Sequence, residues 1–106
     1  MALKQKIQVE DIAQEYASRS LPITSAHIDT NSNKTTWYLG GMNLNVRVFA
    51  TEFSGMTKFT VVFERRDEEV VAEISFVGAD ARAMAKGIAG VVDQIHINDL
   101  EELAAK

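Results

Sequence analysis

The chain has 106 residues, a hydrophobic content of 46% and a net charge of −4 at neutral pH. This length fits a single domain over residues 1–106, which buries roughly 65% of its unfolded surface. The lack of cysteine excludes disulfides and thiolate metal sites, and the negative charge disfavours binding driven by nucleic-acid phosphates. The apolar runs are too short to span a bilayer and no signal sequence is recognised. We therefore expect a cytoplasmic protein without a membrane segment.

Residues 8 to 19 are predicted to form an amphipathic helix. Its apolar residues follow the i, i+3, i+4, i+7 spacing of one buried stripe, namely Val9, Ile12, Ala13 and Tyr16. Acidic residues near its start suit the positive end of the helix dipole. The helix should end before Pro22, because the residue that precedes a proline disfavours helical geometry.

Four turn signals divide residues 23 to 77 into five extended segments. They are Asn31-Ser32-Asn33-Lys34, Gly40-Gly41, Ser54-Gly55 and Arg66-Asp67-Glu68. Glycine between two β-prone runs is typical of hairpins, whose tight loops need positive φ. The segments are therefore predicted to form an antiparallel meander.

Closing each hairpin with a two-residue loop places apolar side chains on one face of the sheet. The expected pairs are Ile28 with Trp37, Trp37 with Leu44, Val48 with Val61, and Val61 with Ile74. Opposed residues share a face, and a slip of one residue would turn each apolar set to solvent. The agreement between hairpins supports the side-chain alternation.

Asp80 is predicted to cap a helix that packs on this apolar face. Its core stripe has helical spacing: Met84, Ile88, Val91 and Ile95. Asn98 is expected to start a short last helix, on which Leu100 and Leu103 dock.

Gly87 and Gly90 lie inside the main C-terminal helix, where each glycine costs about 1 kcal/mol relative to alanine. Their presence predicts the close approach of another backbone. The run Gly87-Ile88-Ala89-Gly90 also resembles the GxxG loop of KH domains, which clamps a nucleic-acid backbone. A continuous helix is favoured, because the strand that follows in KH folds is missing.

The fold class is therefore α+β, a five-stranded antiparallel β-meander with an N-terminal helix and C-terminal helices on one face. The element order is α-β-β-β-β-β-α-α. Five strands at about 4.8 Å make a sheet about 24 Å wide, and one helix covers about 10 Å of it. Both long helices are thus needed on the apolar face, and the other face should be bare.

The bare face carries apolar residues among polar ones, which usually marks an interaction surface. The predicted interaction residues on this face and its edge are Tyr38, Asn45, Arg47, Phe49, Lys58, Val62, Val71, Glu73 and Val77. The last strand, Glu69 to Val77, has no Pro or Lys at its centre to block pairing with another chain. We expect it to mediate a homodimer.

These features favour a small non-catalytic interaction or regulatory module, a homodimer that binds a protein partner through the exposed sheet face. The alternative is a binder of single-stranded nucleic acid, with Tyr38 and Phe49 stacking bases while Arg47 and Lys58 meet phosphates. In topology alone, a meander followed by a helix resembles whirly-type single-strand-binding folds. No cofactor or metal is expected, because His27 and Asp29 lack a third ligand. Enzymatic activity is not expected.

Overall fold

The computed structural model describes residues 7–19, 23–29, 31–65 and 67–105. The elements in chain order are α1 (Val9–Ser18), β1 (Ser25–Asp29), β2 (Lys34–Leu39), the 3-10 turn η1 (Gly40–Met42), β3 (Leu44–Phe53), β4 (Met56–Arg65), β5 (Val70–Val77) and α2 (Ala81–Ala104). The strands form one antiparallel sheet in the order β1-β2-β3-β4-β5. The predicted α+β meander is confirmed.

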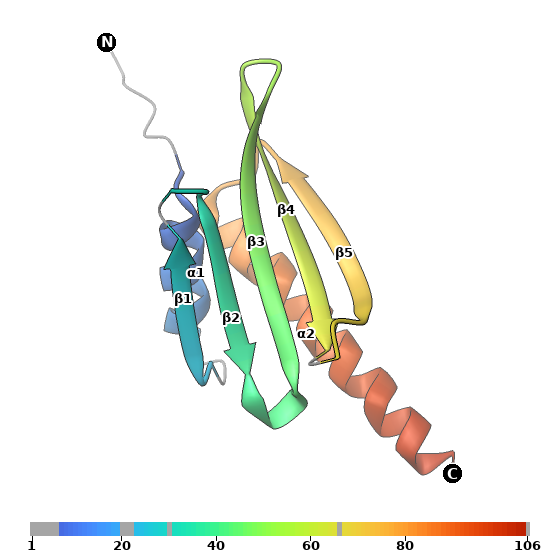
Figure 1. Cartoon of the computed structure of the whole chain (residues 1–106). Coiled ribbons are helices and arrows are strands. Elements are labelled where there is room, and N and C mark those ends of the chain that lie inside the picture. The colour runs from blue at the N-terminus through green and yellow to red at the C-terminus, as the bar shows by residue number, and fades with distance from the viewer. Residues whose placement is uncertain (1–6, 20–22, 30, 66, 106) are drawn as a thin grey trace.

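Both helices cover the same face of the sheet, as its width requires (Figure 1). α1 lies behind the β1–β2 side, and α2 runs diagonally behind β3 and β4 (Figure 1). The two helices also pack against each other. In the described part of the chain, no helix covers the opposite face of the sheet.

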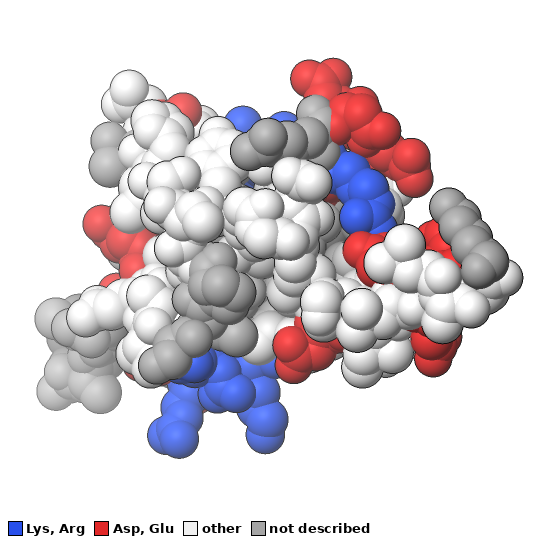
Figure 2. All heavy atoms as spheres, turned by 90° about the horizontal axis from the view of Figure 1, so that it is seen from below, with Lys and Arg blue, Asp and Glu red and all other residues white. Residues whose placement is uncertain are grey.

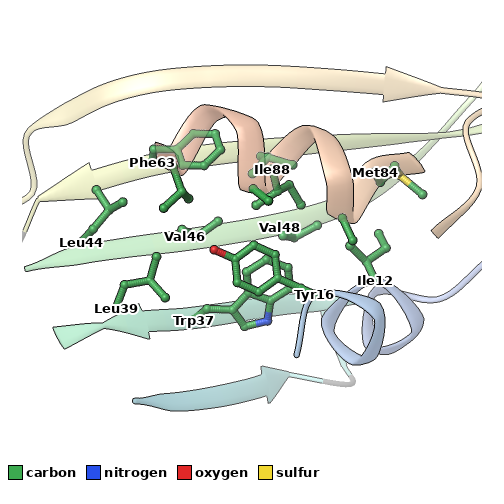
Figure 3. Close-up of a cluster of buried hydrophobic side chains, with 14 of the residues drawn as sticks. Ile12, Tyr16, Trp37, Leu39, Leu44, Val46, Val48, Phe63, Met84 and Ile88 are labelled. Atoms are coloured by element: carbon green, nitrogen blue, oxygen red, sulfur yellow. The ribbon is translucent and has the colours of Figure 1, made fainter. Parts of the chain in front are cut away.

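The core lies between this pair of helices and the inward side chains of the sheet (Figure 3). Tyr16 of α1 stacks on Trp37 of β2, with ring centroids 4.4 Å apart and an interplanar angle of 25°. Burial raises the pKa of Tyr16 to about 12, and the charge of Asp93 adds to the effect. The predicted inward residues Val46 and Phe63 are fully buried.

The predicted register is confirmed for the β3–β4 hairpin and, as far as the pair of Phe63 with Ala72, for the β4–β5 hairpin. It is wrong for the two earlier hairpins. Val48 pairs with Val61, and Val61 pairs with Ile74, as expected. Trp37, however, pairs with Val46 instead of Leu44. The loop between β2 and β3 has four residues, because Gly40–Met42 form a 3-10 turn and Asn43 adopts a left-handed φ of 51°. Four residues in place of two shift the register by two, so the apolar side chains keep their face.

The first hairpin is lengthened in the same way. Ile28 pairs with Thr35 and Ala26 with Trp37, so the predicted pair of Ile28 with Trp37 is wrong. The Asp29 carboxylate accepts hydrogen bonds from the backbone N–H groups of Asn31 (3.1 Å) and Ser32 (3.3 Å). This side-chain turn competes with a two-residue loop and explains the longer connection.

α2 is one continuous helix of 24 residues, so the predicted break at Asn98 is wrong. Its start is as expected, because the Asp80 carboxylate accepts a hydrogen bond from the Ala83 N–H at 2.7 Å. Asn98 accepts a side-chain hydrogen bond from Gln94 at 2.9 Å, within the helix. Leu100 and Leu103 do not dock and are exposed.

The two glycines of α2 have different surroundings. A Cβ at Gly87 would lie 2.9 Å from the ring of Phe76 on β5, so the close approach comes from a side chain and not from a backbone. A Cβ at Gly90 would meet no atom within 4 Å. Both residues lie inside the helix, so the loop of the KH type does not form.

These surroundings predict opposite effects for two matched substitutions. Gly90→Ala should raise the free energy of unfolding by about 1 kcal/mol, because it removes backbone entropy at an open position. Gly87→Ala should bring no such gain, because its Cβ must displace the Phe76 ring. Urea unfolding of both variants measures the difference. An equal gain from Gly87→Ala would contradict the contact between α2 and Phe76.

The core position of Phe63 gives a second prediction. Phe63 has no exposed surface, so Phe63→Ala should lower the free energy of unfolding by about 3–5 kcal/mol. The control Met56→Ala, at an exposed position outside both proposed contacts, should change it by about 0.5 kcal/mol or less. Denaturant unfolding checks both, and a Phe63→Ala variant as stable as the parent would contradict the register.

Candidate interaction surfaces

The open face of the sheet is centred on Phe49 of β3. The Lys34 ammonium lies 5.3 Å from the centre of its ring, and the Arg47 guanidinium carbon lies 5.5 Å from it. Both distances suit cation–π contacts. Phe49 is therefore half-buried beneath two cationic side chains and is not an open stacking platform.

Arg47 also forms a two-point ion pair with Glu64 across the β3–β4 ladder. Its Nε lies 2.7 Å from Oε1 of Glu64, and its Nη2 donates to Oε2 at 2.9 Å. Only the Nη2 contact has the geometry of a hydrogen bond, and the ion pair holds both side chains and neutralises their charges. Asn45 stands directly opposite Glu64 in the ladder and is half-buried.

The other predicted residues of this face do not form one apolar patch. Tyr38 lies near the β2–β3 turn and is 40% exposed, whereas Val62 is half-buried beside Arg47 in the ladder. Lys58 and Val77 pair with each other at the opposite end of the sheet, and both are exposed. The open face is thus a mixed, ion-paired surface.

Val71 does not face outward as predicted. Phe63 pairs with Ala72 and Glu64 pairs with Val70, so a β-bulge leaves Val71 without a partner on β4. An extra residue re-aims the side chains beside it, and Val71 packs against the core. Val70 takes the outward position opposite Glu64 and is exposed.

β5 is an edge strand whose outer side is unpaired in the described chain. The Arg65 N–H donates to the Glu69 carbonyl at 2.9 Å. Since backbone groups alternate in direction along a strand, the odd-numbered residues of β4 bond to β5. Their partners Ala72, Ile74 and Phe76 therefore bond to β4. Glu73, Ser75 and Val77 direct their N–H and C=O groups to the open edge.

The hydrophobic core is also incompletely buried beside this edge. Ile74 and Phe76 point inward but are only partly buried, whereas Val46 and Val61 nearer the sheet centre are fully buried. α2 reaches β5 where the Phe76 ring meets Gly87. A further strand beside β5 would cover both half-buried side chains.

A second apolar surface lies at the end of α2, which sequence reasoning assigned to the core. The last turns of α2 extend beyond the ends of the strands (Figure 1). Ile97, Leu100 and Leu103 are exposed there. The periodicity of these residues correctly predicted a helix, but the length of the sheet beneath it is not encoded in that pattern.

A metal site does not assemble in the described residues. No group of three His, Cys, Asp or Glu side chains there could hold a metal ion. His27 lies on β1 and His96 on α2, and both are exposed. No described helix is both long and apolar enough to cross a membrane.

Comparison with known proteins places the chain in no family. No family model, no curated protein and no solved structure matches it.

Proposed function

We propose that this protein is a non-catalytic interaction module that works as a homodimer joined through β5 and binds a protein partner. The observation that carries the proposal is the open β5 edge with its half-buried inward residues Ile74 and Phe76. Unprotected edges pair with other chains unless something covers them. Pairing satisfies backbone groups and completes the core in one contact.

The side chains of β5 favour a particular two-fold register, with Ser75 opposite Ser75 of the second copy. Because Ser75 directs its backbone groups outward, this register forms mutual hydrogen bonds at the two-fold axis. Ile74 then lies opposite Phe76 of the other copy, and Glu73 lies opposite Val77. A register centred on Glu73 would set two carboxylates against each other, which is unfavourable.

The alternative, binding of single-stranded nucleic acid, has one feature in its favour. Lys34 and Arg47 flank Phe49, which is the composition of a cationic and aromatic platform. Against it, Arg47 is already paired with Glu64, and the chain has a net charge of −4. Phosphate contacts supply most non-specific affinity, so these charges favour a protein partner.

Ser75→Pro tests the dimer. Proline removes a backbone N–H that points to the open edge and not to β4, so the folded monomer should tolerate it. The same removal blocks strand pairing between copies. Light scattering at high micromolar concentration should give a dimer for the parent chain and a folded monomer for the variant.

Ala26→Pro is the matched control at the other edge of the sheet. Ala26 is exposed on β1, and by the same alternation its N–H points away from β2. This variant should remain a dimer. A parent chain that is monomeric, or a folded Ser75→Pro variant that still dimerises, would contradict pairing through β5.

A further inference from the structure

The overhanging end of α2 forms one wall of a surface groove. The other walls are the β2–β3 turn, through Met42, and the end of β4, through Arg65. The groove has a volume of about 410 Å³. No residue of β5 lines it, so it is separate from the proposed dimer contact.

Its helix wall carries two exposed leucines among polar residues. Leu100 is 52% exposed and Leu103 is 67% exposed, and both line the groove one turn apart. Asp99 lies on the same side of the helix, because its carboxylate bonds to Arg65 of β4 at 2.5 Å. Single exposed leucines are ordinary, but two of them with Met42 around one hollow mark a docking surface.

The rim of the groove is acidic. The Arg65 guanidinium is paired with Asp99, and Glu102 lines the groove as a second carboxylate, so carboxylates outnumber this guanidinium there. The hydrogen bond to Asp99 and the charges of Asp99, Glu69 and Glu102 raise the pKa of Arg65. The last turn of α2 contains no basic residue, although the negative end of a helix dipole favours cations. Figure 2 shows acidic side chains gathered near the protruding end of the molecule, with basic side chains beside them.

The two sequence segments that contribute Arg65 and the end of α2 are also acidic. Segments 65–69 and 96–106 together hold six acidic and three basic residues. A ligand for this groove must therefore bring positive charge as well as apolar surface. Nucleic acid does not fit, because its phosphates are negatively charged. A second copy of α2 would bring further carboxylates, those of its own Glu101 and Glu102, to this acidic groove.

We propose that the groove between the end of α2, the β2–β3 turn and the end of β4 docks a basic amphipathic helix of a different protein. Its apolar stripe lies on Leu100, Leu103 and Met42, in the manner of other helix-in-groove complexes. Its Lys or Arg side chains meet Glu69 and Glu102, which steers association and sets specificity. The inference rests on the proposed role as a protein-interaction module, but it does not depend on the β5 dimer.

The test uses a labelled helical peptide of Leu and Lys, about 15 residues long so that a helix can form. Titrating the full chain should give saturable binding that weakens with salt. Amide NMR shifts should change for residues 41–43, 65 and 96–103. The double variant Leu100→Ala/Leu103→Ala should bind at least about tenfold more weakly.

Ile97→Ala is the matched control, since Ile97 is exposed on the same overhang but does not line the groove. It should bind like the parent, and a peptide with Glu in place of Lys should not bind. Equal binding by all variants, binding of the Glu peptide, or no binding at all would overturn the proposal. So would a changed subunit number in the Leu100→Ala/Leu103→Ala variant. Light scattering measures the β5 dimer without the peptide. Each of the two proposals can therefore be contradicted while the other holds.

Discussion

The structure depends on covering a five-stranded sheet with two helices. A sheet of this kind is about 24 Å wide, and a helix with its side chains covers about 10 Å. The described helices lie on one face and pack against each other, so cover is concentrated over the central strands (Figure 1). Val46 and Val61 are fully buried there, whereas Ile74 and Phe76 at the margin are not. Side chains at the margin of the sheet are therefore only partly buried, because the two helices do not extend over them.

The diagonal course of α2 connects the two surfaces that we assign to interactions. Near its start, α2 meets β5 through Gly87 and Phe76 and leaves the outer edge of that strand unpaired. Near its end, the helix runs past the strands, where Leu100 and Leu103 have no sheet beneath them. On the open face of the sheet, charged side chains pair with each other, notably Arg47 with Glu64.

The sequence predicted the face of each strand better than its register. Both early hairpins have loops of four residues, set by local bonds of Asp29 and by the left-handed Asn43. A shift of two preserves alternation, so hydrophobic patterning could not reveal it. The bulge at Val71 was also missed, because it is a feature of the pairing between β4 and β5. The continuous helix through Asn98 was missed because the Asn98 side chain bonds to Gln94 within the helix and does not cap a new one. Of the predicted surface, Tyr38 is well exposed. Phe49 is covered by Arg47, two residues away on the same strand, and by Lys34, which only the pairing of β2 with β3 brings near.

Amide hydrogen exchange of the two edge strands tests pairing through β5 most directly. The Ser75 and Ala26 N–H groups both point away from the sheet within one chain, so neither is protected in a monomer. Exchange is measured by NMR at high protein concentration and again after dilution. If β5 pairs between two copies, Ser75 is protected at high concentration and loses protection on dilution, while Ala26 exchanges fast throughout. Fast exchange of Ser75 at every concentration would contradict it.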